Sequence, residues 1–189
     1  VNGYLLAYIA MMPLAGRLGD RFGIPRLFMA ALAVFAAGSL LSGMAQSLDW
    51  LIAARIVQGL GAGAILPLAT AGASLLYDGH SRARALGVVG AATFLGMALG
   101  PFLGATVLET FDLSAALDHA HLFPALHGYV EDAWRWVFYL GAPLAIVALV
   151  WVWAVAPRWE EEPHPGRLDA MGGALLTAAL AAALLALTG

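Results

Sequence analysis

The sequence predicts an all-α membrane protein, and three observations support that prediction. Hydrophobic residues make up 62% of the 189 residues and charged residues only 11%, against roughly 45–50% and 25% in soluble domains. The apolar residues form long runs that are separated by short polar connections. All nine Lys and Arg residues are arginines, and seven of them gather at alternate connections. A chain of this length has too small an interior to hide so much apolar surface, so lipid is the expected solvent.

Six apolar segments follow one another along the chain. A helix needs about 20 apolar residues to cross the hydrocarbon core. The first segment, residues 1–15, is short for a span, and we expect further residues of a longer membrane protein to complete it. The other predicted spans are residues 27–45, 50–77, 85–108, 136–156 and 170–187.

The arginines predict the orientation of these spans. Seven of the nine lie in the first, third and fifth connections, whereas Arg135 lies on the opposite side and Arg55 inside a span. The positive-inside rule therefore places residues 16–26, 78–84 and 157–168 in the cytoplasm, with the spans in the plasma (inner) membrane. Residues 157–168 also form an acidic, proline-containing linker. We expect it to separate a helical bundle, residues 1–156, from a last span, residues 169–189.

The first connection, residues 16–26, is here termed the latch segment. Gly16 and Gly23 allow non-helical backbone, so a charged turn is expected. Asp20 can cap the following helix or pair with an arginine such as Arg21 or Arg26. On charge alone, a connection that only sets orientation remains an equally good interpretation.

Arg55 lies about 9 Å into its predicted helix, at 1.5 Å per residue. An arginine at mid-membrane costs about 2.5–3.5 kcal/mol, so such residues usually face a cavity or a partner. An arginine that reaches back to the outer surface is the alternative. Gln58 and Gly59 follow within one helical turn. Because a guanidinium does not lose its proton in proteins, the expected role of Arg55 is to pair with or tune a carboxylate on another helix.

Glycines 96, 100 and 104 recur every four residues in the fourth span, with Pro101 beside the second of them. This spacing lines one helix face and lets a neighbouring backbone approach closely. Pro101 removes a backbone donor and is expected to bend the helix. Generic helix packing explains the glycine spacing equally well.

These segments resemble the major facilitator superfamily. The latch segment matches its cytoplasmic signature loop between helices two and three at Gly16, Leu18, Asp20, Arg21, Gly23 and Arg26, while Ile24 and Pro25 replace usually basic residues. The run from Arg55 through Gln58 and Gly59 is similar to the helix-four motif of proton-coupled drug antiporters, although Gly63 stands where alanine is usual. Residues 96–104 resemble the antiporter motif of helix five. Residues 134–140 and 168–176 resemble helices six and seven of the fourteen-helix drug/proton antiporter branch.

The resemblance implies helices two to six of an N-terminal bundle, partial in this chain, plus one additional span. It implies a secondary active transporter that exports amphiphilic small molecules or drugs in exchange for protons by alternating access. The latch segment would hold one state closed, Arg55 would tune the coupling, and residues 96–104 would form a packed seam. The expected partners are substrate, protons, the lipid bilayer and the missing N- and C-terminal parts of the transporter. A symporter or uniporter for a nutrient or metabolite, and a non-transporting membrane scaffold or receptor, are the alternatives.

Enzymatic function has no support in the sequence. The absence of cysteine excludes disulfides, thiolate metal sites and a cysteine nucleophile. Residues 59–64 match a dinucleotide-binding fingerprint, but they lie within an apolar helix and do not follow a strand. His119 and His121, in the acidic connection 109–133, are expected to be solvated. No cofactor, metal or nucleic acid is expected.

Overall fold

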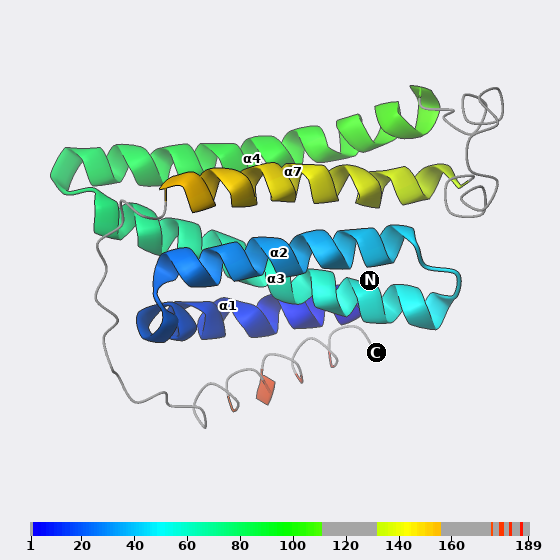
Figure 1. The fold of residues 1–189 in the computed structure, drawn as a ribbon, viewed down its shortest axis with the longest axis horizontal. Coiled ribbons are helices and arrows are strands. Elements are labelled where there is room, and N and C mark those ends of the chain that lie inside the picture. The colour runs from blue at the N-terminus through cyan, green and yellow to red at the C-terminus, as the bar shows by residue number, and fades with distance from the viewer. Residues whose placement is uncertain are drawn as a thin grey trace.

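The computed structural model describes residues 2–110 and 132–155, together with the isolated helical positions 175, 178, 179, 182 and 186. The two continuous ranges form five helices and contain no strand, which confirms the all-α prediction. The helices are α1 (Asn2–Phe22), α2 (Ile24–Gly43), α3 (Leu48–Leu76), α4 (Gly79–Thr110) and α7 (Ala133–Val155). Figure 1 shows them lying lengthwise beside one another, with α4 and α7 along one side of the bundle.

Four of these helices are long and apolar enough to cross a membrane: α2, α3, residues 79–106 of α4 and residues 134–155 of α7. Helix α1, whose last two turns carry Arg17, Asp20 and Arg21, is not among them. The chain is therefore a multi-pass membrane protein. The predicted linker 157–168, nearly all of the predicted last span 169–189, and the histidines of the 109–133 connection lie outside the described residues.

The predicted turn in the latch segment is wrong in extent, because α1 continues through Phe22 and α2 begins at Ile24. Gly16 stays helical, and only Gly23 leaves the helix, with a φ of 85° that an L side chain rarely adopts. Pro25 lies in the first turn of α2, where its missing N–H costs no helical bond. Asp20 does not cap α2, which has no side-chain cap hydrogen bond. Polar residues at a membrane surface therefore extend a helix here and do not end it.

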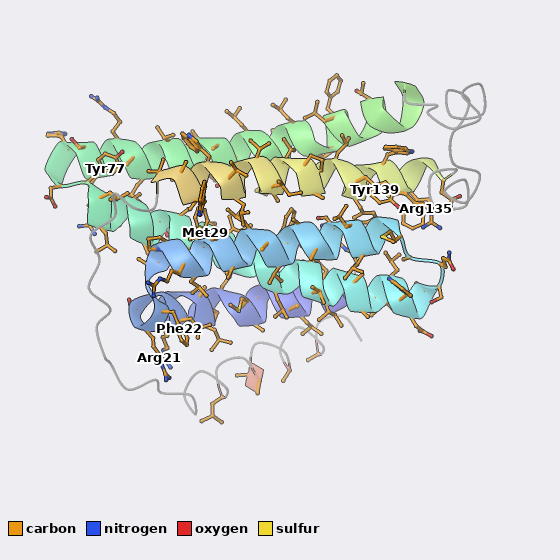
Figure 2. All side chains as sticks on the ribbon, in the orientation of Figure 1. Arg21, Phe22, Met29, Tyr77, Arg135 and Tyr139 are labelled. Atoms are coloured by element: carbon orange, nitrogen blue, oxygen red, sulfur yellow. The ribbon has the colours of Figure 1, made fainter. Side chains whose placement is uncertain are left out.

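The third connection is similarly short. Only Tyr77 and Asp78 lie outside a helix, and α4 begins at Gly79. Arg82 and Arg84, predicted to lie in a loop, form part of the first turns of α4. Figure 2 shows Tyr77 and Arg21 at one end of the bundle and Arg135 at the other, the arrangement that the alternation of arginines predicts.

Helix α3 lies against both α1 and α2, and glycines set the close approach. At Gly59 a Cβ would meet the backbone oxygen of Tyr4 at 2.6 Å, so this residue faces α1. At Gly61 a Cβ would meet the backbone nitrogen of Phe35 at 2.5 Å and the oxygen of Ala31 at 2.7 Å, so this residue faces α2. The glycines that mimic a nucleotide fingerprint are therefore packing contacts. The buried core beside them consists of Ala15, Ile24, Ala31, Ala64 and Leu68.

Candidate functional site

Helix α3 carries Arg55 about 10 Å from its first residue, Leu48, at 1.5 Å per residue. The helix starts where Ser47 accepts a hydrogen bond from the Trp50 backbone N–H at 3.2 Å, which satisfies one of the free donors of the first turn. The Trp50 indole N–H donates to the Leu41 carbonyl oxygen at 3.2 Å and ties α3 to the end of α2. Arg55 therefore lies within the membrane-spanning part of a well-anchored helix.

The guanidinium of Arg55 is held by one amide and two aromatic rings. Its Nη1 donates to the Gln58 side-chain oxygen, one turn further along α3. Its central carbon lies 4.0 Å from the ring centroid of Tyr4, on α1, and 5.3 Å from that of Phe138, on α7. Both distances are within the range of cation–π attraction. The side chain therefore faces neighbouring helices.

Gln58 extends this polar network to α2. Its Nε2 donates to the Ser39 hydroxyl oxygen at 2.7 Å, and the two side chains are buried, with 5% and 0% exposure. The neighbouring Ser42 hydroxyl donates instead to the Gly38 carbonyl oxygen of its own helix, at 2.7 Å. Residues of all four helices α1, α2, α3 and α7 thus meet around Arg55. The sequence pattern predicted Arg55 and Gln58 but did not single out Ser39 or Tyr4.

No carboxylate among the described residues pairs with Arg55. Arg135, by contrast, pairs with Asp132 at 3.1 Å. Arg55 can therefore supply a fixed positive charge to an acid but cannot itself release a proton. Gly59, the third predicted residue of this site, contacts α1 and brings Tyr4 close to the arginine.

The two other predicted sites lie away from Arg55. The latch segment is at the opposite end of the bundle, where Asp20, Arg21 and Arg26 are exposed. At Gly96, Gly100 and Gly104 a Cβ would meet nothing within 4 Å. Figure 1 shows α4 curving away from α7 over its C-terminal part, which contains Pro101. Within the described residues this glycine face has no neighbour, so the packed seam stays a prediction.

A family model for the major facilitator superfamily matches residues 1–188. This chain belongs to the major facilitator superfamily. The superfamily consists of transport proteins and not of enzymes, and the similar proteins described below are named transporters. At Gly63, where alanine is usual in the resembling motif, a Cβ would clash with the Tyr8 backbone oxygen. In this chain α1 therefore lies closer to α3 than an alanine at residue 63 would allow.

Several bacterial transporters are similar to this facilitator chain. A triacylglyceride transporter of Mycolicibacterium hassiacum is 40% identical over 187 residues, which cover 99% of this chain and 31% of that protein. A triacylglyceride transporter of Mycolicibacterium smegmatis is 39% identical over 180 residues, which cover 95% of this chain and 29% of that protein. An uncharacterised facilitator-type transporter of Mycobacterium tuberculosis is 32% identical over 171 residues, covering 90% and 26%. The chain spans about a third or less of the length of these relatives.

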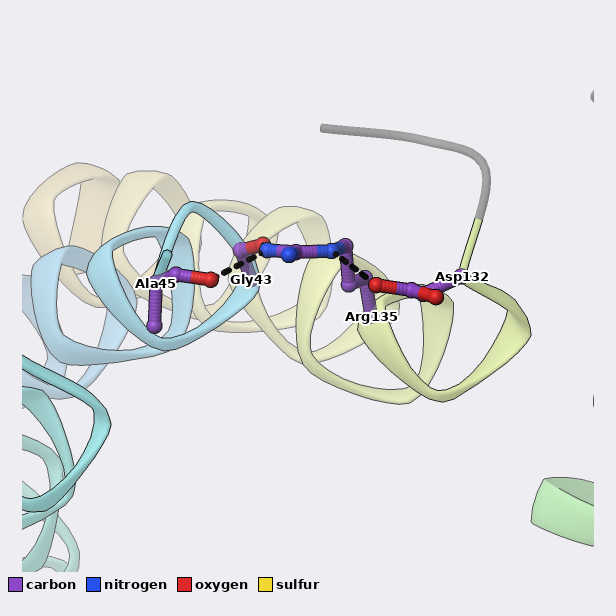
Figure 3. A network of polar contacts seen from close by, with 4 residues as sticks. All are labelled: Gly43, Ala45, Asp132 and Arg135. Atoms are coloured by element: carbon purple, nitrogen blue, oxygen red, sulfur yellow. Dashed lines mark hydrogen bonds and ion pairs between the residues drawn. The ribbon is translucent and has the colours of Figure 1, made fainter. Parts of the chain in front are cut away.

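Arg135 holds α7 to the end of α2, a role that the sequence did not predict. Figure 3 shows its side chain reaching from α7 to the end of α2, where its Nη1 donates to the carbonyl oxygens of Gly43 at 2.7 Å and Ala45 at 2.6 Å. Its Nε pairs with Asp132 at 3.1 Å. These bonds satisfy carbonyls that the end of a helix leaves without partners. A signal existed, because an arginine in the first turn of a helix opposes the helix dipole and so needs nearby acceptors.

Proposed function

We propose that this chain is part of a secondary active transporter that exports amphiphilic molecules in exchange for protons. The proposal rests on the Arg55 site. An arginine inside a span is held between Tyr4 and Phe138, bonded to Gln58, and has no carboxylate partner among the described residues. Buried ionisable residues of membrane helices mark ion pathways and usually have a partner. The partner acid would belong to a part of the transporter outside the described residues.

The Arg55 charge would couple protons to transport through that acid. While the acid is ionised, Arg55 stabilises it as an ion pair; when the acid takes up a proton, the attraction is lost and the two helices are free to separate. Alternating access then requires one bundle to rock against the other around a site near the membrane midplane. In this proposal the latch segment, residues 16–26, holds one state closed at the cytoplasmic end. The Gly96–Gly104 face of α4 forms the seam with the second bundle.

The names of the relatives bear on the cargo. Two of the similar proteins are triacylglyceride transporters, and we extend to this chain a cargo with long apolar parts. The finer assignment, to the fourteen-helix drug/proton antiporter branch, rests on the motifs at residues 134–140 and 168–176. We further propose that the protein lies in the plasma membrane with residues 16–26, 78–84 and 157–168 in the cytoplasm, according to the arginine distribution.

The test is proton-driven export by the full-length transporter in proteoliposomes, with a fluorescent acylglycerol and a cationic amphiphilic dye as cargo. Arg55→Ala should abolish export that a proton gradient drives. Arg82→Ala is the matched control, because Arg82 is an exposed arginine of α4, and it should export at the wild-type rate. Wild-type export by Arg55→Ala would refute the role of this site.

The same assay separates the alternative functions. In an antiporter, cargo moves in the direction opposite to the protons. Reversing the proton gradient should therefore reverse the net cargo flux and keep it opposite to the proton flow. A symporter would move cargo and protons in the same direction. Flux that ignores the gradient would indicate a uniporter, and no flux with either cargo would favour a scaffold or receptor.

A further inference from the structure

A cavity of about 710 Å³ opens at the arginine-rich end of the bundle, the end opposite to Arg135. Its walls come from α2, α3, α4 and α7 and are mostly aliphatic and aromatic. Among the lining residues, Leu76, Val88 and Trp151 are 46%, 63% and 74% exposed. Its volume is in the range of small-molecule sites, about 300–1,000 Å³. The cavity is distinct from the Arg55 site, with which it shares no residue.

The depth of the cavity matches one leaflet of a bilayer. It is lined on α4 from Ser81 to Val89 and on α3 from Ala69 to Leu76, with Tyr77 directly after the end of α3. Each stretch covers up to about 12 Å along its helix axis, whereas half of the hydrocarbon core measures about 15 Å. The lining residues lie at the end of the bundle that the positive-inside rule assigns to the cytoplasm. A hydrocarbon chain entering from the cytoplasmic surface would therefore fill the cavity without crossing the membrane.

The polar side chains that line the cavity are three hydrogen-bond donors: Tyr77, Ser81 and Arg84. All three are exposed and lie where α3 ends and α4 begins. In the described part of the chain, ion-pair geometry is met by Arg135 with Asp132 and not by Arg84. A positive charge beside hydroxyl donors, above an apolar interior, complements a ligand with an anionic head and a hydrocarbon tail. A neutral acylglycerol would leave the charge unused, and a water-soluble anion would leave the interior empty.

We propose that this cavity binds an anionic phospholipid of the cytoplasmic leaflet, with one acyl chain between α3, α4 and α7 and its phosphate on Arg84. Basic pockets between membrane helices on the cytoplasmic side are a known mode of anionic lipid recognition. The bound acyl chain would also stabilise the position of α4. Among the described residues, the spanning part of α4 has no buried residue, so a lipid packed between α4 and its neighbours would hold α4 onto the bundle.

The experiment places the full-length transporter in phosphatidylcholine nanodiscs that contain a minor fraction of phosphatidylglycerol with a photoreactive group midway along one acyl chain. The comparison probe is phosphatidylcholine with the same reactive chain. Labelling by phosphatidylglycerol should map to cavity residues such as Leu76, Val88 and Trp151. Arg84→Gln should lower that labelling about fivefold, the factor expected for one arginine near an anionic headgroup. Arg82→Gln should leave it unchanged, because Arg82 does not line the cavity.

A second variant tests the cavity itself. Ala85 lines the cavity on α4, so Ala85→Trp should fill it and reduce labelling by both probes, while Arg84→Gln affects only the anionic one. Equal labelling of the cavity by both probes in the wild type would overturn the proposal. So would labelling confined to other surfaces, which would mean that another part of the transporter covers this face. Arg55→Ala should label like the wild type, so loss of transport and loss of lipid binding are read separately.

Discussion

Replacing Gly61 by alanine tests whether α2 and α3 are held by backbone contact. The added Cβ would lie 2.5 Å from the Phe35 backbone nitrogen and 2.7 Å from the Ala31 oxygen. Carbon–oxygen contacts in proteins settle near 3.3–3.6 Å, so the two helices would have to separate by about 0.6–0.9 Å. Overpacking of this kind costs about 1–3 kcal/mol. Alanine also stabilises a helix by about 1 kcal/mol relative to glycine. The measured change in stability of Gly61→Ala is therefore smaller than the cost of the clash.

Gly96→Ala is the matched control for Gly61→Ala. It adds the same methyl group to the interior of a spanning helix and gains the same propensity, but its Cβ would meet nothing within 4 Å. The difference between the two variants isolates the cost of separating the helices. At about 2–4 °C per kcal/mol for a chain of this size, Gly61→Ala should melt roughly 2–12 °C below Gly96→Ala. The measurement is thermal unfolding of the purified 189-residue chain in detergent, followed by circular dichroism.

The reasoning fails if the two alanine variants melt at the same temperature. Gly38→Ala supplies an independent check from the other helix, since its Cβ would lie 2.5 Å from the Gln58 Cα. The melting temperature of Gly38→Ala should be close to that of Gly61→Ala and below that of Gly96→Ala. If only one of the two interface variants is destabilised, α2 can shift to relieve one contact, and backbone contact along the whole interface is refuted.

Three further predictions concern the Arg135 contacts between α7 and α2, the Gln58–Ser39 hydrogen bond and the glycine face of α4. Arg135→Gln should lower the melting temperature of the chain by several degrees, because each buried carbonyl left without a donor costs about 1–3 kcal/mol; an unchanged value would show that water replaces the guanidinium. Ser39→Ala should alter the pH profile of export by the full-length transporter, because Gln58 loses its acceptor, whereas Ser42→Ala should not; identical profiles for the two would contradict the network. Gly100→Ala should melt at the same temperature as Gly96→Ala, because a Cβ at either position meets nothing within 4 Å, but it should slow export by the full-length transporter; normal export would contradict the seam.

Hydropathy and arginine placement were sufficient to predict the helical fold and the ends at which charges lie. They misplaced the helix ends, because the prediction treated polarity as a helix terminator. In the structure α1 remains helical through Arg17, Asp20 and Arg21, and the chain changes direction at the positive φ of Gly23 alone. Polar side chains at the membrane surface do not interrupt the i→i−4 backbone hydrogen bonds of α1. The helix ends where Gly23 adopts a positive φ.

The candidate site was predictable only where one segment contains the signal. Arg55 and Gln58 lie one turn apart, and an arginine inside an apolar run is conspicuous without a structure. Ser39 and Tyr4 became visible only when α1, α2 and α3 were packed together, since each looks ordinary in its own helix. Arg135 bonds to carbonyls roughly ninety residues earlier in the chain. The position of Arg135 in the first turn of α7 signals that it needs acceptors, but backbone carbonyls carry no residue identity, so the sequence does not show which ones it bonds to.

Arg55 and Arg135 differ in a way that bears on function. Both guanidinium groups lie over aromatic rings. Arg135 bonds to two carbonyls and to Asp132, so its charge and donors are used in holding α7 to α2. Arg55 has the same five N–H donors, yet among the described residues it donates to the amide oxygen of Gln58 alone. The Arg55 guanidinium is half-buried and held by Tyr4, Phe138 and Gln58, but most of its N–H donors are not used by these neighbours. Such an arrangement favours binding of an anion. In the proposed antiport mechanism, the acid that pairs with Arg55 would lie on a helix that packs against Tyr4 and Phe138.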